Sequence, residues 1–482
     1  MRWFGSIFVQ THCFMIEGEG SFEEFEWEAP IERFEDMLKN KKNWFFDVDD
    51  FELLIDYYLD RGNFKKAGLA LSFAKEQHPD ATSLKLREAQ VCLTNGKLNK
   101  ALEILDEIEL LEPNSEEVVL MKASIYSQQR QYKKAIQYYE KAISFNTENV
   151  DEILLDLAFE YENTEQYEKA IDCLHETLNR NPENEAALYE LAYCYDLANK
   201  HDECIKYYHQ FLDENPYSFT AWYNLGNAYS KVENFEKSVQ ALDFCILIQE
   251  NFASAHFNKA NALMQLERFS DALECYNNAL KHEDAQAVTY AYIGECYEKM
   301  EQLDEALFYY QKALKLDEEW GDAYLGIGIV KDLQGHINEA LTYINKAIAC
   351  DSENADYWYV YAEGLKKAEL FEEAENAFLK VIGLEPENYN AYIDYVSLLE
   401  VQEQFAKAIE IAEEAIVLFP ENAEIKYRHA AILFSSGLQQ EAKINFEACL
   451  REHYNSKDLI FEYFEDAKNI AIIAELIELY KN

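Results

Sequence analysis

Tyr132-Lys133-Lys134-Ala135 belongs to a pattern that returns about every 34 residues along this 482-residue chain. The alanine of this string is one of twelve small residues in register, which we call the anchor column. Ten of the eleven intervals between anchors are 34 residues long, and one is 35. The anchors are Ala67, Ala101, Ala135, Ala170, Cys204, Ser238, Ala272, Ala306, Ala340, Ala374, Ala408 and Ala442. Such a period indicates stacked copies of one supersecondary unit.

Two further columns keep the same register. A large apolar residue stands three positions before the anchor in ten of the twelve copies, and His201 and Gln439 are the exceptions. Twelve positions before the anchor the residue is alanine or glycine in ten copies. Small residues at fixed places let helix axes approach closely, while large neighbours fill the grooves between them. These columns predict packed helices in every copy.

Proline marks the end of each predicted pair of helices. Six of the seven prolines stand twelve residues after an anchor, where the missing N–H and the restricted preceding residue end a helix. Residues that favour helix N-caps follow two positions later, at Ser115, Asn184, Ser218, Asn388 and Asn422. Each copy is therefore predicted to be a helical hairpin. A single hairpin cannot bury its apolar face, so the copies must stack into an α-solenoid.

The stretch Ala221-Trp222-Tyr223-Asn224-Leu225-Gly226-Asn227-Ala228-Tyr229, followed by Phe235, Ser238 and Leu242, resembles the tetratricopeptide repeat family. The resemblance covers residues 48–456 in twelve units. It implies an all-α fold, a right-handed superhelix of about twelve helix-turn-helix repeats. The second and last units depart from the pattern at Lys85, Glu88, Lys426 and His429, and we interpret these departures as effects of the ends of the stack.

Both ends of the chain are predicted to cap the array. Residues 1–47 form an N-terminal extension with an expected helix near Ile31–Asn40, and residues 457–482 show the apolar periodicity of closing helices. Residues 3–16 carry no full charge, and their apolar run is too short for a membrane span or for the core of a signal peptide. Because the acidic, helix-forming composition of the chain begins at Met15, we hypothesise that Met15 is the physiological start. We expect a cytoplasmic protein.

The composition limits the classes of partner. There are 91 acidic and 43 basic residues, which give a net charge of −48. This field repels nucleic acids and lacks the electrostatic attraction on which their non-specific binding depends. The acidity is explained either by a solubilised helical surface or by a preference for basic partners.

No pattern for catalysis, cofactor binding or metal binding is found. The ten cysteines include no CxxC pair, and many stand at equivalent repeat positions, as buried reduced thiols would. His201 and Cys204 occupy packing columns, which favours packing over a metal or a reactive thiol. Gly326 and Gly328 lack the preceding strand and third glycine of a dinucleotide fingerprint. We therefore expect no enzymatic activity.

The resemblance implies that the first helices of successive repeats line a groove for extended peptides or helices. The residues expected to face it are Tyr189, Tyr193, Tyr223, Asn224, Asn227, Phe257, Asn258, Asn261, Tyr292 and Glu295. Asparagine can hydrogen-bond a peptide backbone through both its donor and its acceptor. Alternatively, these asparagines bridge neighbouring helices.

A cationic clamp for a C-terminal carboxylate, a second binding mode of the family, needs lysine and arginine on this face. The groove is instead predicted to be acidic, through Glu190, Asp196, Glu295, Glu298, Asp322, Asp332, Glu363 and Asp394. We expect a non-catalytic scaffold or adaptor whose protein or peptide partner is neutral or basic with apolar anchors. The alternative is a substrate-recruiting subunit of a multi-protein enzyme or secretion complex, with catalysis on another chain.

Overall fold

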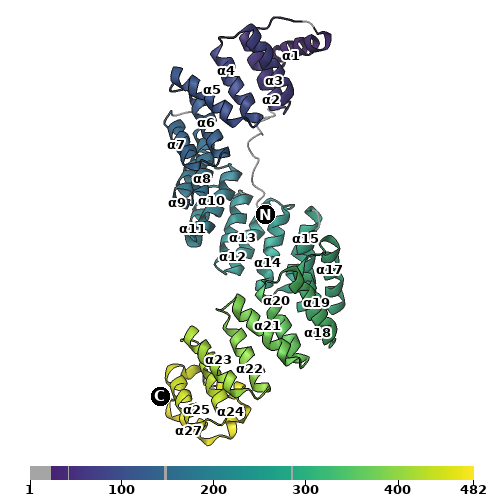
Figure 1. Cartoon of the computed structure of the whole chain (residues 1–482), viewed down its shortest axis with the longest axis vertical. Helices are drawn as coiled ribbons and strands as arrows, with labels where there is room; N and C mark the ends of the chain where they lie inside the picture. Colours follow the sequence, from purple (N-terminus) through teal and green to yellow (C-terminus); the bar gives the residue numbers. More distant parts are fainter. Residues whose placement is uncertain (1–22, 42, 146–148, 284–285, 482) are drawn as a thin grey trace. The chain divides into compact units, whose positions relative to one another are not determined.

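The computed structural model describes residues 23–41, 43–145, 149–283 and 286–481, and this part contains helices, turns and loops but no strand (Figure 1). The predicted all-α class is therefore confirmed. The chain forms two compact units, Met1–Ile248 and Gln249–Asn482, and each is described by itself. The proposed start at Met15 lies outside the described residues.

The first unit contains one leading helix and six helical hairpins. Helix α1 spans Glu23–Asn40. The first helices of the hairpins are α2 (Val48–Asp60), α4 (Thr82–Thr94), α6 (Glu116–Gln128), α8 (Val150–Asn163), α10 (Glu185–Leu197) and α12 (Phe219–Lys231). The second helices are α3 (Phe64–Gln77), α5 (Leu98–Leu111), α7 (Tyr132–Ile143), α9 (Tyr167–Arg180), α11 (His201–Glu214) and α13 (Phe235–Ile248).

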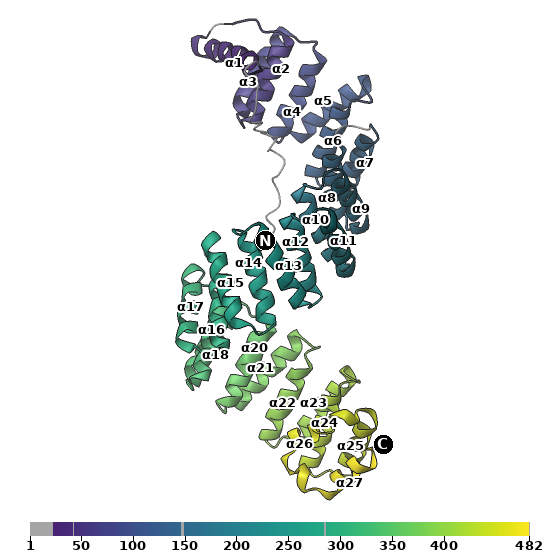
Figure 2. The same ribbon diagram turned by 180° about the vertical axis from the view of Figure 1, so that it is seen from behind.

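The second unit contains six more hairpins and a short closing segment (Figure 2). Its first helices are α14 (Ala253–Gln265), α16 (Ala287–Lys299), α18 (Gly321–Leu333), α20 (Ala355–Lys367), α22 (Tyr389–Val401) and α24 (Ala423–Ser435). Its second helices are α15 (Phe269–His282), α17 (Leu303–Leu316), α19 (Ile337–Cys350), α21 (Phe371–Leu384), α23 (Phe405–Leu418) and α25 (Gln439–Glu452). The described residues thus contain the twelve hairpins that the repeat period predicts.

Every second helix begins three residues before an anchor, so each anchor is the fourth residue of its helix. All twelve anchors are buried, eleven of them with no exposed surface and Cys204 with 3%. The one hydroxyl in the column, that of Ser238, forms a hydrogen bond with the Ser230 hydroxyl at 2.7 Å. A larger side chain at these positions would have to displace a neighbouring helix, since the interior is close-packed.

The alanine or glycine that stands twelve positions before the anchor in ten copies, which we call the small column of the first helices, is packed as closely as the anchor column. An added Cβ at Gly226 would lie 2.6 Å from Leu242 Cγ, and one at Gly328 would lie 2.6 Å from Ile344 Cγ1. Both contacts join a first helix to the second helix of the same hairpin. The two small columns therefore bring the helices of a hairpin together.

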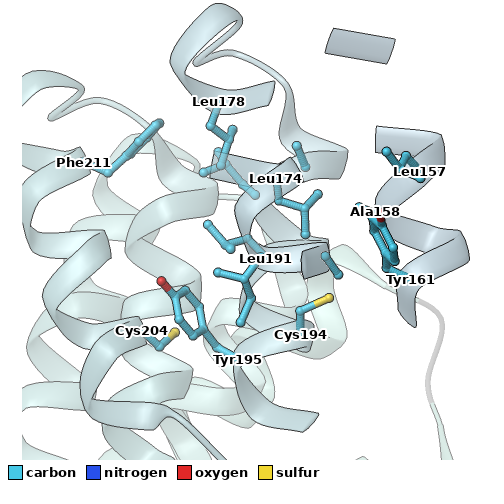
Figure 3. Packing of buried hydrophobic residues seen from close by; sticks show 14 of the residues in the cluster. Leu157, Ala158, Tyr161, Leu174, Leu178, Leu191, Cys194, Tyr195, Cys204 and Phe211 are labelled. Carbon is cyan, nitrogen blue, oxygen red and sulfur yellow. The ribbon is translucent and has the colours of Figure 1, made fainter. Parts of the chain in front are cut away.

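One cluster of buried residues in the first unit extends through consecutive hairpins from α6 to α13. Figure 3 shows the part formed by α8 to α11, where Leu157 and Leu174 belong to one hairpin and Leu191 and Phe211 belong to the next. Cys194 and Cys204 are buried in the same cluster. All nine described cysteines are free thiols and seven of them are buried, which confirms the predicted use of cysteine as a small core residue in the described part of the chain.

The helix ends follow the predicted signals closely. The six second helices that precede a proline end two residues before it, as α9 ends at Arg180 before Pro182. Four of the five expected N-cap side chains accept a hydrogen bond from a backbone N–H of the first turn: Asn184, Ser218, Asn388 and Asn422. Ser115 begins α6 without such a bond.

Both ends of the array carry additional helices. The helix expected near Ile31–Asn40 is the second half of α1, and its Phe34 and Met37 are buried against the first hairpin. The C-terminal segment folds into α26 (Leu459–Tyr463) and α27 (Ala471–Leu479), with short 3-10 helices at Tyr454–Ser456 and Glu465–Asn469. Ile460, Ile473 and Leu476 are buried in a cluster with residues of α24 and α25.

The turn inside each hairpin has a feature that the columns do not predict. The residue five positions before every anchor has a positive φ, between 57° and 80°. In a typical turn Gln166 N donates to Tyr161 O and Glu165 N donates to Glu162 O, the paired bonds of a left-handed helix C-terminus. Four of these twelve residues are glycine, six are glutamate, and the others are Arg130 and Asn199.

Two glycines of the first hairpin test this conformation. Gly62 has φ +67°, whereas Gly68 lies inside α3, and an added Cβ would meet nothing within 4 Å at either site. Gly62→Ala should destabilise the hairpin by about 1 kcal/mol because an L side chain is strained at positive φ. Gly68→Ala should stabilise it by about 1 kcal/mol because glycine is the poorer helix former. Hydrogen exchange of α2 and α3 measures both, and equal shifts would contradict the prediction.

Candidate functional site

The first helices present a recurring set of side chains that are not part of the two small columns. We call the residues fifteen, fourteen and eleven positions before each anchor the first-helix stripe. All ten residues expected to bind a partner belong to it, five in each unit. The predicted groove across both units stays a prediction.

In the first unit the stripe is aromatic on α10 and α12. The rings of Tyr189 and Tyr223 meet edge to face, with centroids 6.1 Å apart. Tyr193 is 45% exposed, and Tyr189 is also exposed. Asn227 lies one turn after Tyr223 on α12 and is half-buried. These side chains offer apolar surface with polar groups at its edge, a combination common in protein-binding sites.

Asn224 does not face solvent, which corrects its assignment to the binding surface. Its side chain is 3% exposed. Its Nδ2 donates to Leu188 O at 3.0 Å and to the Tyr208 hydroxyl at 3.3 Å, so it joins α12 to both helices of the preceding hairpin. The bridging alternative therefore holds for this asparagine, because a buried amide must satisfy its hydrogen bonds internally.

In the second unit the stripe residues of α14 and α16 surround a buried tyrosine of α15. The rings of Tyr276 and Tyr292 are stacked with centroids 5.7 Å apart, and Phe257 meets Tyr292 edge to face at 5.8 Å. The Tyr276 hydroxyl donates to Asn261 Oδ1 at 2.6 Å, so Asn261 also supports packing. Asn258 is half-buried. Burial raises the pKa of Glu295 above its ordinary value, and the nearby carboxylates Glu298 and Asp322 add to the shift.

Most of the acidic residues predicted to line the groove are bonded to a neighbouring helix. Lys231 Nζ lies 2.9 Å from Asp196, and Lys367 forms an ion pair with Asp332. The Tyr357 hydroxyl donates to Asp322 at 2.6 Å. Similar tyrosine–carboxylate bonds join Tyr359 to Asp394 and Tyr310 to Glu298. The two lysines offset the charge of Asp196 and Asp332, whereas the tyrosine hydroxyls occupy acceptor sites of the other three carboxylates and leave their charge in place.

Glu190 differs from these residues because its neighbour is another carboxyl group. It lies on α10 beside Glu162 of α8, and its Oε1 is buried without a hydrogen-bond donor in the described part of the chain. Burial, together with the Glu162 carboxyl, raises the pKa of Glu190 well above its ordinary value. Glu162 was not among the predicted site residues, because nothing in the sequence pairs it with Glu190.

A second group of buried carboxyls lies on α8. The Ser127 hydroxyl donates to Glu160, whose Oε2 is buried without a partner in the described residues. Burial raises the pKa of Asp156 to about 7, a hydrogen bond with Tyr139 opposes the shift, and the charge of Glu160 adds to it. Glu160 is buried, and Asp156, which stands fourteen positions before the anchor Ala170, is half-buried; we expect both to affect the stability of the stack.

The described residues hold no group of three or more His, Cys, Asp or Glu side chains that could bind a metal ion. His201 begins α11 with its Nδ1 3.7 Å from Asp196, and Cys204 is buried, so these two residues have the structural positions that their columns predict. Within the described helices, none is both long and apolar enough to cross a membrane.

Family models match the chain in several segments. Models described as tetratricopeptide repeat match residues 58–125, 116–149, 253–284, 287–319 and 362–423. Residues 163–245 match a model described as anaphase-promoting complex, cyclosome, subunit 3. No curated protein matches the sequence.

Solved structures of several repeat proteins are similar to this chain. MamA is 21% identical over 35% of this chain and 98% of its own, with a TM-score of 0.32. YrrB, described as a TPR protein with an unusual peptide-binding site, is 23% identical over 38% of this chain and 95% of its own, with a TM-score of 0.30. The hetero-tetramer Cut9-Hcn1 of the APC/C is 12% identical over 83% and 92%, with a TM-score of 0.42. Each is a likeness in fold alone.

Asn224 and Asn258 stand at the same repeat position, and comparing them tests whether Asn224 bridges neighbouring helices. Asn224→Ala should cost about 1–3 kcal/mol because the substitution removes two buried hydrogen bonds and leaves the Tyr208 hydroxyl oxygen without its donor, although Tyr208 still donates to Leu188 O. Asn258→Ala should cost less, since its side chain is less buried. Thermal melts of the two variants give the comparison, and equal losses would argue against a bridging role.

The raised pKa of Asp156 predicts a pH dependence of stability. The folded state keeps the proton up to about pH 7 and the unfolded state loses it near pH 4. This contribution to stability is therefore present below about pH 4 and is lost as the pH rises to about 7. Asp156→Asn should remove that loss. At about pH 8 the free energy of unfolding of the variant should therefore exceed that of the parent chain by about 2 kcal/mol. Melting curves at about pH 5 and about pH 8 measure it, with Asp213→Asn as the exposed control.

Proposed function

Because the chain belongs to the tetratricopeptide repeat family, we propose that it is a non-catalytic interaction scaffold that binds a partner along the first-helix stripe. The bound element is an extended peptide or a helix. The observation that carries this proposal is the exposure of Tyr189 and Tyr193 on consecutive turns of α10, while the anchor columns beside them are buried. Aromatic side chains kept at a surface by a rigid helical scaffold are typical anchors for a partner.

The charge of the chain supports a neutral or basic partner. At a net charge of −48, a polyanion is repelled over the whole surface. A basic segment is attracted, and this attraction raises the rate of association more than it raises affinity. Affinity would come from apolar side chains that pack against the stripe tyrosines and Phe257.

A second candidate function is a recruiting subunit in a multi-protein enzyme complex, with catalysis on another chain. The match of residues 163–245 to the model of an anaphase-promoting complex subunit supports this reading. The two functions share the same stripe and differ in what is bound there. Co-purification of the full chain with an enzymatically active partner would favour the second.

A pull-down from the native source compares two matched quadruple variants of the full chain. The stripe variant combines Tyr193→Ser, Asn227→Ala, Phe257→Ser and Asn258→Ala. The control makes a similar set of changes outside the stripe, with one glutamine in place of an asparagine: Tyr217→Ser, Gln240→Ala, Phe308→Ser and Asn278→Ala. The stripe variant should lose the specific partner while keeping its helix content by circular dichroism, and the control should retain it. Retention by both variants would place the binding surface elsewhere.

A further inference from the structure

The repeat allows the same contact to be compared along the chain. We compare the residue fourteen positions before an anchor with the residue eight positions before the preceding anchor, on the neighbouring first helix. In the last two hairpins these residues are Arg428 of α24 and Glu400 of α22. The Arg428 guanidinium donates to the Glu400 carboxylate, and Arg428 is buried. A guanidinium therefore fits between two first helices at this position.

In α8 and α10 the same two positions are Glu162 and Glu190. Of the eleven such pairs that the sequence defines, this one alone consists of two carboxyl groups. In the described part of the chain, neither glutamate forms an ion pair with Lys, Arg or His. The two carboxyl groups are hydrogen-bonded to each other, and Glu190 Oε1 has no partner there. Because burial and the Glu162 carboxyl raise the pKa of Glu190 to about 9, the pair carries one negative charge near neutral pH and holds no cation of the kind that Arg428 supplies to Glu400.

Two exposed aromatic side chains flank the carboxyl pair. Phe159 precedes Glu162 by three residues on α8, and Tyr193 follows Glu190 by three residues on α10. Residues three apart on a helix lie on the same face, so each ring stands beside one carboxyl group. Phe159 is 36% exposed and Tyr193 is 45% exposed. A cation bound between the glutamates would meet these ring faces, which attract it further.

We propose that Glu162 and Glu190, flanked by Phe159 and Tyr193, form a receptor for an arginine side chain of the partner. The guanidinium would take the place that Arg428 has against Glu400, with its planar donors directed at both carboxyl groups. This inference rests on the proposed function and names the chemistry by which one part of the first-helix stripe selects its partner. The basic partner favoured by the net charge supplies the required residue.

The test uses a fluorescein-labelled nonapeptide of glycine and leucine with two arginines, titrated against the full chain by fluorescence anisotropy. The matched probe replaces both arginines with citrulline, which keeps the shape and removes the charge. The double variant Glu162→Gln with Glu190→Gln should weaken binding of the arginine peptide about tenfold or more at about 0.15 M salt. It should leave binding of the citrulline peptide unchanged.

The control Asp213→Asn with Glu214→Gln removes two charges from the exposed end of α11, at least as many as the glutamine variant removes. It should change affinity by less than about twofold, because only general attraction is reduced. A second variant, Glu190→Arg, places an internal guanidinium opposite Glu162 and should also block the arginine peptide. Circular dichroism checks the fold of the Glu162→Gln/Glu190→Gln and Glu190→Arg variants. Neither should melt at a lower temperature than the parent chain, because each variant removes a buried carboxyl group that has no cation beside it.

Equal affinity of the parent and the Glu162→Gln/Glu190→Gln variant for the arginine peptide would overturn the receptor. Equal affinity of the parent for the arginine and citrulline peptides would overturn it as well. The native partner then separates this proposal from the proposed function. If the stripe quadruple variant loses that partner and the glutamine variant keeps it, the scaffold function stands and the arginine receptor fails.

Discussion

The close contact of small residues between helices is the constraint on which the rest of the molecule depends. Each anchor is the fourth residue of a second helix and is buried, so the helix axes meet at one fixed point in every hairpin. Because a hairpin exposes an apolar face until the next hairpin covers it, stability is shared between neighbours. Clusters of buried residues therefore run along neighbouring hairpins and have no closed centre, as the cluster from Val119 to Ala241 illustrates.

This arrangement limits the positions of each repeat at which a binding function can lie. The anchor column, the small column of the first helix and the prolines between hairpins leave few positions free of packing duties. Cys204 and His201 could be taken for reactive residues in a sequence search. Both occupy packing positions: Cys204 is buried, and His201 lies beside Asp196. Under the proposed function, substitutions that change binding without loss of the fold would be concentrated on the first-helix stripe.

The sequence predicted the helix boundaries well because they depend on local chemistry. Proline ends helices through its missing N–H, and Asn184 or Asn388 begins the next one through a single side chain. The burial of Asn224 and the contact of Glu162 with Glu190 were not predictable in the same way. Both depend on which side chains of neighbouring hairpins face each other, and the period alone does not determine that. The left-handed turns were also missed, since glutamate at six of them gives no signal of positive φ.

The acidic residues of the first helices divide into two classes with different effects on binding. Carboxylates such as Asp322 and Asp332 are bonded across hairpins, and removal of their tyrosine or lysine partners would weaken the stack. These groups still contribute to the long-range field, but a partner must compete with internal bonds to reach them. Glu162 and Glu190 have no such internal cation, so an arriving guanidinium replaces no existing ion pair. Attraction by the whole surface and recognition at a few positions are therefore separable properties of this chain.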